Sequence, residues 1–408
     1  MSAWRDRLPA YAGFGAVLSA AGLPIYIYAP KYYADTYGVS LTSLGAILFG
    51  LRLFDVVQDP VLGWISERLT NGKAAIISAV SALLALSMIG LFAIAPPIDP
   101  AIWFALTITG LFSAFSFLSI NFYAQGVVKS GADGQVRLAA WRETGALLGV
   151  CIAAVTPTLL MDLHDDPFAV FAYGFAAATL AATLFMWPEW TGRMTSEPAQ
   201  IRDILRDQLT RKLLILALVN ATPLAVSSTL FLFFVESRLQ AVGWEGPLLV
   251  LFFLAAALSA PVWSGLAGRF GEKRVLLVAM GLALVSFGFA ATLGAGDGAL
   301  FAVICVVSGA TIGADLTLLP AMFARRMAQI SPNGGQGFGL WSLVSKFTLA
   351  FAAAVLLPLL EWSGFSAGAG TQPDSALATL TALYAILPIV LKLVSMGLLA
   401  RINLETQR

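Results

Sequence analysis

Three charged residues lie close together inside an apolar stretch of the chain. Arg52, Asp55 and Asp59 occur in the segment LRLFDVVQDPVLGW, within the otherwise apolar run 41–66. At about 1.5 Å per residue, a helix of this length spans a bilayer. Ionised side chains are costly inside a membrane and usually face a partner, a cavity or a transported ion. The stretch is therefore the first candidate for a functional site, and cation binding is the chemistry it suggests.

The spacing of these residues places their side chains on one face of a helix. Asp55 and Asp59 are four residues apart, and Arg52 precedes Asp55 by three. Two close carboxylates repel each other, which favours a proton or a small cation that both can share. We therefore expect Asp55 and Asp59 to bind a coupling ion, which is H⁺ or Na⁺. The two aspartates are metal ligands only if that ion is Na⁺. A permanent buried salt bridge between Arg52 and one aspartate is the alternative.

Composition places this stretch in a membrane protein. Of the 408 residues, 59% are apolar and 12% are charged, a balance that no soluble domain of ordinary surface has. The net charge is +1 and the basic residues form no cluster, which argues against a nucleic-acid partner. We expect the lipid bilayer and a small-molecule substrate as partners, and a monomer.

Twelve apolar runs are long enough to be spanning helices. They lie near residues 10–34, 41–66, 74–95, 100–128, 138–161, 168–187, 212–236, 245–268, 273–294, 299–324, 337–360 and 377–402. When the loops are taken alternately, 18 of the 24 lysines and arginines fall on one side. Since basic loops stay in the cytoplasm, both termini are predicted to be cytoplasmic, in a bacterial inner membrane.

The chain repeats itself when it is shifted by 201 residues. The matching pairs are Pro60 with Pro261, Arg68 with Arg269, Gly134 with Gly335, Gln135 with Gln336 and Pro157 with Pro358. The repeat predicts an N-terminal six-helix bundle (1–187), a cytoplasmic linker (188–211) and a C-terminal six-helix bundle (212–408). Two such halves are typical of secondary transporters that work by alternating access.

No catalytic motif competes with this interpretation. The sequence has no GxxxxGK[ST] phosphate-binding loop, no dinucleotide or haem fingerprint, and no evident nucleophile with a base. We therefore expect no enzyme activity and no cofactor beyond the coupling ion.

Further charged residues in the apolar runs are candidates for substrate binding or charge pairing. Lys346 lies mid-helix with no acid in its own run, so Asp55 or Asp59 is the expected partner, with snorkelling to an interface as the alternative. Lys392 is closer to a helix end, where snorkelling is favoured. Arg142 and Glu143 are either a substrate-binding pair or an ion pair at a helix end.

Asp315 and several aromatic residues complete the candidate set. Asp315 is expected to pair with Arg142 or Lys346, or to contact substrate. Tyr26, Tyr123 and Trp341 could line a cavity, although most aromatic residues in such helices pack or lie at the membrane interface.

With these residues assembled, the chain resembles the glycoside, pentoside and hexuronide cation symporters, the melibiose permease family of the major facilitator superfamily. The likeness rests on RLFDVVQDPVLGW with its basic turn, and on GFGA, YYADTYGVS, WRETGALLG and the central Lys346. It implies an all-α membrane protein of the major facilitator fold. It also implies that Asp55 and Asp59 are cation ligands, that Arg52 and Lys346 are their charge partners, and that Arg142 is a donor to the substrate.

The sequence departs from the family pattern at several of these sites. Ala20 and Ser119 stand where sugar symporters of the family have aspartates that bind sugar hydroxyls, which disfavours a galactoside. Gln58 replaces the asparagine that helps to coordinate sodium, so sodium is not favoured over protons. We place Gln58 and Ser116 in the cation site, and Ser119 with the substrate-binding residues.

These observations predict cation-coupled symport of a small organic solute, with glycoside-like solutes as one class. A proton-coupled exporter or a lysolipid carrier is the alternative among transporters. A sensor or assembly factor that uses a transporter fold but moves nothing is the alternative from another class.

Overall fold

The structure is a computed structural model that describes residues 7–69, 72–130, 134–161, 163–190, 200–365 and 372–402. Within its helices, the side chains of residues 23–27, 31, 41, 42, 52, 56, 158, 161, 349, 350 and 353 lie outside the description. The described residues form helices and connecting turns, without a β-strand.

The first half of the chain folds into six long helices. They are α2 (Leu8–Tyr37), α3 (Leu41–Arg68), α4 (Lys73–Phe92), α5 (Pro100–Ser130), α6 (Gln135–Met161) and α7 (Pro167–Met186), followed by the short helix η1 (Trp187–Glu189). Side-chain caps fix several helix starts, since Ser40 accepts a hydrogen bond from the amide of Ser43 at 3.2 Å. Gly38 ends α2 with a φ of 67°, a conformation that glycine adopts without strain.

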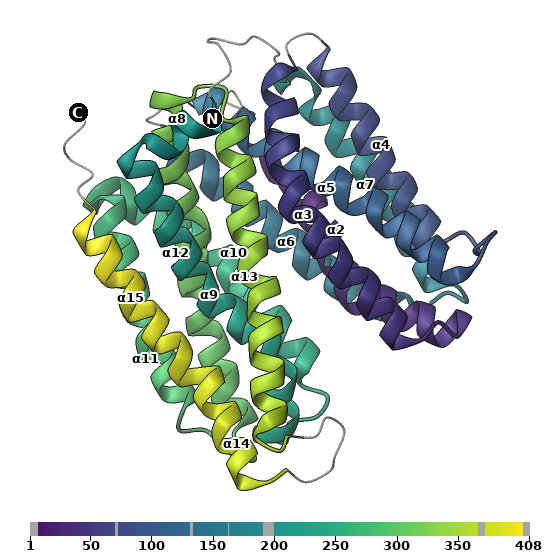
Figure 1. Cartoon of the computed structure of the whole chain (residues 1–408), viewed down its shortest axis with the longest axis vertical. Helices are drawn as coiled ribbons and strands as arrows, with labels where there is room; N and C mark the ends of the chain where they lie inside the picture. Colours follow the sequence, from purple (N-terminus) through teal and green to yellow (C-terminus); the bar gives the residue numbers. More distant parts are fainter. Residues whose placement is uncertain are drawn as a thin grey trace. The chain divides into compact units, whose positions relative to one another are not determined.

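The second half has six more spans, two of which contain a π-helical turn. The elements are α8 (Ile201–Arg206), α9 (Gln208–Phe233), η2 (Phe234–Arg238), α10 (Glu245–Phe270), α11 (Glu272–Ala290), α12 (Gly298–Ile330), α13 (Gly335–Trp362), α14 (Asp374–Thr381), η3 (Ala382–Ile386) and α15 (Leu387–Arg401). The π-helical turn η2 extends α9, and η3 joins α14 to α15. Figure 1 shows α9, α11 and α15 side by side.

Nine of the spans that the structure describes have the length and hydropathy of a membrane crossing. The other three, α2, α3 and α13, are 30, 28 and 28 residues long. The prediction of an all-α membrane protein with twelve spanning helices is thereby confirmed.

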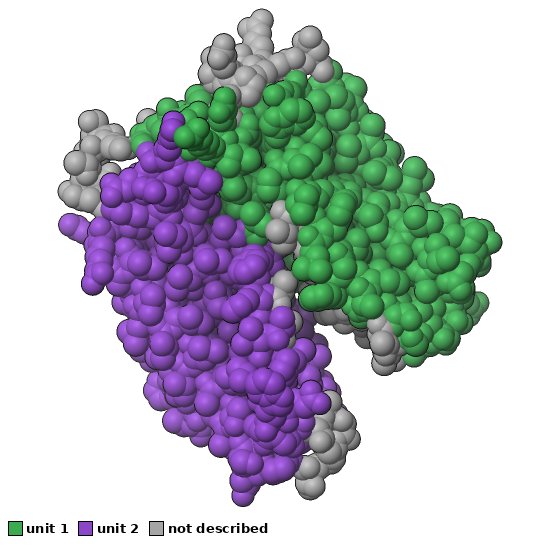
Figure 2. Space-filling view, viewed as in Figure 1, with its two compact units in different colours: residues 1–204, 324–343 green, residues 205–323, 344–408 purple. Residues whose placement is uncertain are grey.

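The chain divides into two compact units, coloured separately in Figure 2. Unit 1 contains residues 1–204 and 324–343, and unit 2 contains residues 205–323 and 344–408. The end of α12 and the first turns of α13 therefore pack with the N-terminal helices. The predicted bundle boundaries at residues 187 and 212 stay a prediction.

Close helix contacts in each unit depend on glycine. A Cβ atom at Gly145 or Gly149 of α6 would lie 2.0 or 2.1 Å from a backbone oxygen of α2. In unit 2, a Cβ atom at Gly309 of α12 would lie 2.2 Å from the backbone oxygen of Phe252 on α10. Small residues let helix backbones approach closely in a membrane, and they bring the polar side chains of these helices together.

Candidate functional site

Helix α3 buries the two aspartates that the sequence singled out. Asp55 is 2% exposed and Asp59 is 0% exposed. Ser342, in the first turns of α13, donates a hydrogen bond from its hydroxyl to Oδ2 of Asp59 at 2.7 Å. Gln58, between the two acids, is half-buried, and its Oε1 atom has no hydrogen-bond partner among the described residues. The Arg52 side chain lies outside the described residues.

Three glycines hold α3 and α13 at the distance that this hydrogen bond requires. A Cβ atom at Gly63 would lie 2.8 Å from the backbone oxygen of Gly335, and one at Gly339 would lie 2.9 Å from that of Asp59. Such separations leave no room for a side chain on either helix. The contact keeps Ser342 within reach of the Asp59 carboxylate.

A third acid of α3, Glu67, binds the start of α13. Its Oε1 atom accepts a hydrogen bond from the backbone amide of Gln336 at 2.9 Å, and Oε2 accepts one from the Gln336 side chain at 3.3 Å. The hydroxyl of Ser331 donates to Oε1 at 3.4 Å. A carboxylate at a helix N-terminus is stabilised by free amides and the helix dipole. Glu67 was not among the residues predicted from sequence, because it lies in the last turn of α3, just beyond the apolar run 41–66.

Arg142 and Glu143 of α6 form a buried ion pair with Tyr123 of α5. Nε of Arg142 lies 2.8 Å from Oε1 of Glu143, which also accepts a hydrogen bond from the Tyr123 hydroxyl at 2.9 Å. The guanidinium carbon lies 3.7 Å from the centre of the Tyr123 ring, a cation–π distance. Nη2 of Arg142 is buried and has no hydrogen-bond partner among the described residues. The pair is thus internal to unit 1, and one guanidinium nitrogen stays available as a donor.

Helix α5 carries two more of the predicted residues. Ser116 is fully buried and Ser119 is half-buried. On the same helix, Asn121 accepts a hydrogen bond from Ser66 at 2.8 Å, and Gln125 accepts one from Lys73 at 3.1 Å. Polar contacts therefore tie α5 to α3 and α4 along the inside of unit 1.

Three other predicted residues belong to α2 and α13. Trp341 is half-buried in the first turns of α13, and the Tyr26 side chain lies outside the described residues. Lys346 is half-buried and belongs to unit 2, so its pairing with Asp55 or Asp59 stays a prediction.

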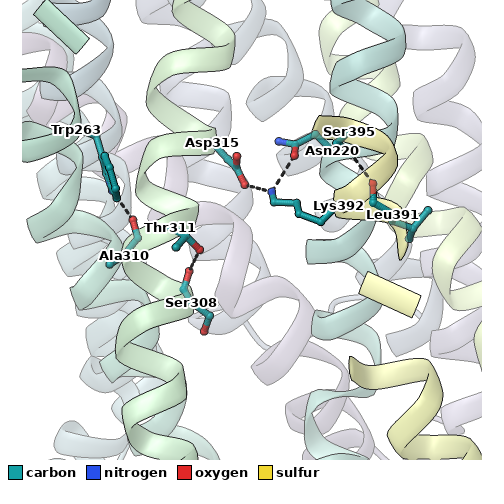
Figure 3. A network of polar contacts seen from close by, with 9 residues as sticks. All are labelled: Asn220, Trp263, Ser308, Ala310, Thr311, Asp315, Leu391, Lys392 and Ser395. Atoms are coloured by element: carbon teal, nitrogen blue, oxygen red, sulfur yellow. Dashed lines mark hydrogen bonds and ion pairs between the residues drawn. The ribbon is translucent and has the colours of Figure 1, made fainter. Parts of the chain in front are cut away.

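Unit 2 contains a buried charged cluster that the sequence did not predict. Lys392 of α15 pairs with Oδ2 of Asp315 on α12, and its ammonium donates a hydrogen bond to Oδ1 of Asn220 on α9 at 2.8 Å. Figure 3 shows the Asp315 carboxylate and the Lys392 ammonium pointing toward each other. The expectation that Lys392 snorkels is wrong, since the residue is 1% exposed. Asp315 pairs with Lys392 instead of the partners expected from sequence.

Comparison with known proteins decides what kind of molecule this is. The profile of the family described as MFS/sugar transport protein matches residues 9–406. The inner membrane symporter YicJ of Escherichia coli K12 is 22% identical over 412 residues, covering 91% of this chain and 85% of that protein. The raffinose permease of Escherichia coli is 29% identical over 163 residues, covering 38% of this chain and 36% of that protein. The chain belongs to the glycoside–pentoside–hexuronide:cation symporter family.

The fold of this chain is similar to the solved structures of two other transporters. A bacterial homologue of the iron transporter ferroportin, in its outward-facing state, has a TM-score of 0.69 at 14% identity, covering 97% of this chain and 100% of that chain. The fucose:proton symporter of Escherichia coli has a TM-score of 0.64 at 14% identity, covering 95% and 97%. At this identity the likeness shows the major facilitator fold alone.

Family membership confirms the coarse function predicted from the sequence. This symporter is an integral membrane protein that moves a small solute coupled to an ion, and it is not an enzyme. The family resemblance drawn from the α3 motif is likewise confirmed.

Proposed function

We propose that Asp55 and Asp59 bind the coupling cation, H⁺ or Na⁺, of an importer of small organic solutes. The observation that carries the proposal is the burial of both carboxylates on one face of α3, with Asp59 bound to Ser342 of α13. Buried acids in a membrane span require a charge partner, a proton or a bound ion. Ser116 and Gln58, whose Oε1 atom lacks a partner among the described residues, supply further oxygen ligands.

The hydrogen bond from Ser342 gives cation binding a way to act on α13. An ionised carboxylate accepts a stronger hydrogen bond than a neutral one. A cation that neutralises Asp59 therefore weakens the bond and loosens the first turns of α13 from α3. Because residues 344 onward belong to unit 2, this stretch is one of the covalent connections between the units, and it is the one through which the ionic state of Asp59 would act on the second unit.

Arg142 is the proposed donor to the substrate. Its guanidinium is held by Glu143 and Tyr123, while Nη2 has no partner among the described residues. A fixed guanidinium with a free N–H is suited to a hydroxyl or carboxylate oxygen of a solute. Related transporters named for raffinose and fucose support a hydroxylated solute. Of the other residues predicted for substrate binding, Ser119, Tyr123, Trp341 and Tyr26 belong to unit 1, and the roles of Lys346 and Asp315 in unit 2 stay predictions.

The proposal includes the topology expected from the basic loops. Both termini lie in the cytoplasm, the two six-helix bundles are joined by the linker 188–211, and the protein acts as a monomer in a bacterial inner membrane. The inner membrane symporter YicJ supports this location.

Solute uptake by reconstituted vesicles tests the proposal. Candidate solutes are first found by a thermal-shift screen of sugars, peptides, organic acids and lysolipids, since a ligand of the folded state stabilises it. Uptake is then driven by an imposed proton or sodium gradient. Asp55→Asn and Asp59→Asn should each abolish gradient-driven accumulation, and the exposed Asp165→Asn should accumulate solute as the natural protein does.

Three results would contradict the proposal. Full accumulation of solute in both aspartate variants would show that Asp55 and Asp59 of α3 do not form the cation site. Solute that leaves the vesicles against the imposed gradient would favour an exporter. A solute that binds but never crosses would favour a sensor.

A further inference from the structure

A small cavity inside unit 2 has one charged group in a mostly apolar wall. Its volume is about 70 Å³, enough for roughly five water-sized spheres. The wall is built by α9, α10, α11, α12, η3 and α15, and much of it is aromatic, including Phe231, Phe252, Phe287 and Phe301. Among the described residues that line it, Lys392 is the charged one. A cavity of this kind selects a small ligand that is apolar at one end and anionic at the other.

The Lys392 ammonium has donor capacity left for such a ligand. An ammonium carries three N–H donors, and within the described chain Lys392 uses them on Asn220 and Asp315. The Lys392 side chain also lines the cavity, and a ligand oxygen that reached Nζ there would meet the remaining N–H. The Nζ atom is therefore the anchoring atom for an anion.

One group beside this ammonium and one in the cavity wall also lack partners among the described residues. Asp315 is 8% exposed, and its Oδ1 atom has no hydrogen-bond partner among the described residues. The Ser227 hydroxyl, in the wall of the cavity, is buried and also without a partner there. A buried polar group that is left unsatisfied costs about 1–3 kcal/mol. A ligand that brings an oxygen and a proton to this region satisfies these groups.

Charge balance decides what must enter with an anion. Lys392 and Asp315 together carry no net charge, so an added anion would leave one negative charge buried, which is costly in a low-dielectric interior. Asn220 of α9 is neutral, and the other titratable groups in the cavity wall are Cys305 of α12 and Tyr384 of η3. Helices α10 and α11 contribute apolar side chains to the wall. Asp315 is thus the group that can accept a compensating proton.

We propose that this cavity binds a short-chain monocarboxylate, such as acetate or propionate, together with one proton. The ligand carboxylate replaces the Asp315 carboxylate on the Lys392 ammonium, and a proton from water binds to Asp315. No covalent bond of the ligand changes, and the site stays neutral throughout. The site is built from residues of unit 2 alone, and it goes beyond the function proposed for Asp55, Asp59 and Arg142.

The size and lining of the cavity set the length of the acid. A volume of about 70 Å³ holds a group of about four or five non-hydrogen atoms when each occupies roughly one water-sized sphere. The phenyl rings of the wall suit an aliphatic tail. Acetate and propionate fit this description, whereas hexanoate exceeds it.

Calorimetric titration of the purified full chain in weakly buffered solution tests the proposal. Acetate or propionate should bind with uptake of one proton per anion, and the apparent Kd should rise about tenfold per pH unit where that uptake occurs. Hexanoate should bind at least about tenfold more weakly, and the neutral propanamide should not bind. Binding without proton uptake, or hexanoate binding as tight as propionate, would overturn the proposal. The titration needs no gradient, so it is independent of coupling in unit 1.

Variants of the charge pair separate the anchor from the proton acceptor. Asp315→Asn should still bind propionate but without proton uptake and without the pH dependence. Lys392→Gln should lose at least about tenfold in affinity, whereas the exposed Lys212→Gln should bind as the natural protein does. The double variant Asp315→Asn with Lys392→Gln buries no unpaired charge, so it should fold and bind no acid. Natural affinity in that double variant would also overturn the proposal.

Discussion

Removing the Ser342 hydroxyl should tighten cation binding at Asp59. In the structure, this hydroxyl donates a 2.7 Å hydrogen bond to Oδ2 of a fully buried carboxylate. The bond stabilises the ionised carboxylate more than the neutralised one, because charge strengthens the acceptor. Ser342→Ala removes that preference while keeping the side chain small. The cation-free state is therefore the one that loses stability.

The size of the effect follows from the energy of one charged hydrogen bond. Such a bond contributes about 1.5–3 kcal/mol to a charged acceptor and about 0.5–1.5 kcal/mol to a neutral one, so the preference for the ionised carboxylate is about 1–1.5 kcal/mol. Each 1.36 kcal/mol is a tenfold change in an equilibrium constant, so the affinity for the coupling cation should rise roughly 5- to 13-fold. Binding is measured as stabilisation of the purified protein against heat, at increasing sodium concentration or decreasing pH. The half-saturating cation concentration gives the affinity directly.

Two further variants serve as controls for this prediction. Ser342→Thr keeps a hydroxyl at the same position and should bind the cation within about threefold of the natural protein. Ser363→Ala removes a hydroxyl just beyond the end of α13, where it donates a hydrogen bond to the carbonyl of Leu360, and it should leave the cation affinity unchanged. Unchanged or weaker cation affinity in a folded Ser342→Ala protein would refute the link between α13 and the Asp59 charge.

Two further contacts in unit 1 give predictions of their own. Glu67→Gln should weaken the contact with the amide of Gln336 by about 1 kcal/mol, so hydrogen exchange at the start of α13 should speed up roughly fivefold. Exchange at the natural rate would show that Glu67 does not hold this helix end. Gly149→Ala places a Cβ atom 2.1 Å from the backbone oxygen of Ala16, and should cost about 1–3 kcal/mol through overpacking. Thermal unfolding measures that loss against Gly174→Ala, where a Cβ atom meets nothing within 4 Å.

The helices were predictable from sequence because a membrane span requires a long apolar run. The last run, at 377–402, corresponds to α14, η3 and α15 in the structure. The π-helical turn within it was not predicted. A π-turn adds one residue to a helical turn, and here the turn contains Tyr384, whose ring stacks on Phe234 with centres 4.1 Å apart. Hydropathy contains no sign of such a contact.

Candidate residues could be named from sequence, but their partners could not. Asp55 and Asp59 stand out because acids are rare in apolar runs. Lys392 is just as unusual in an apolar run, yet its partners in the structure, Asp315 and Asn220, are 77 and 172 residues away from it in the chain. Glu67 meets Gln336 across 269 residues. Local spacing shows which residues share a helix face, whereas the pairing of faces follows from helix packing over the whole unit.

The internal repeat pairs each of these buried acids with a buried alanine in the other half of the chain. A shift of 201 residues places Asp55 and Asp59 on Ala256 and Ala260 of α10, both of which are 0% exposed. The corresponding shift places Asp315 on Ala114 of α5, which is 1% exposed. Each position is thus buried in both halves, and an apolar methyl group suffices there for packing. Since a buried acid is far more costly than alanine, packing alone does not explain the acids, and this asymmetry supports the proposed role of Asp55 and Asp59 in cation binding.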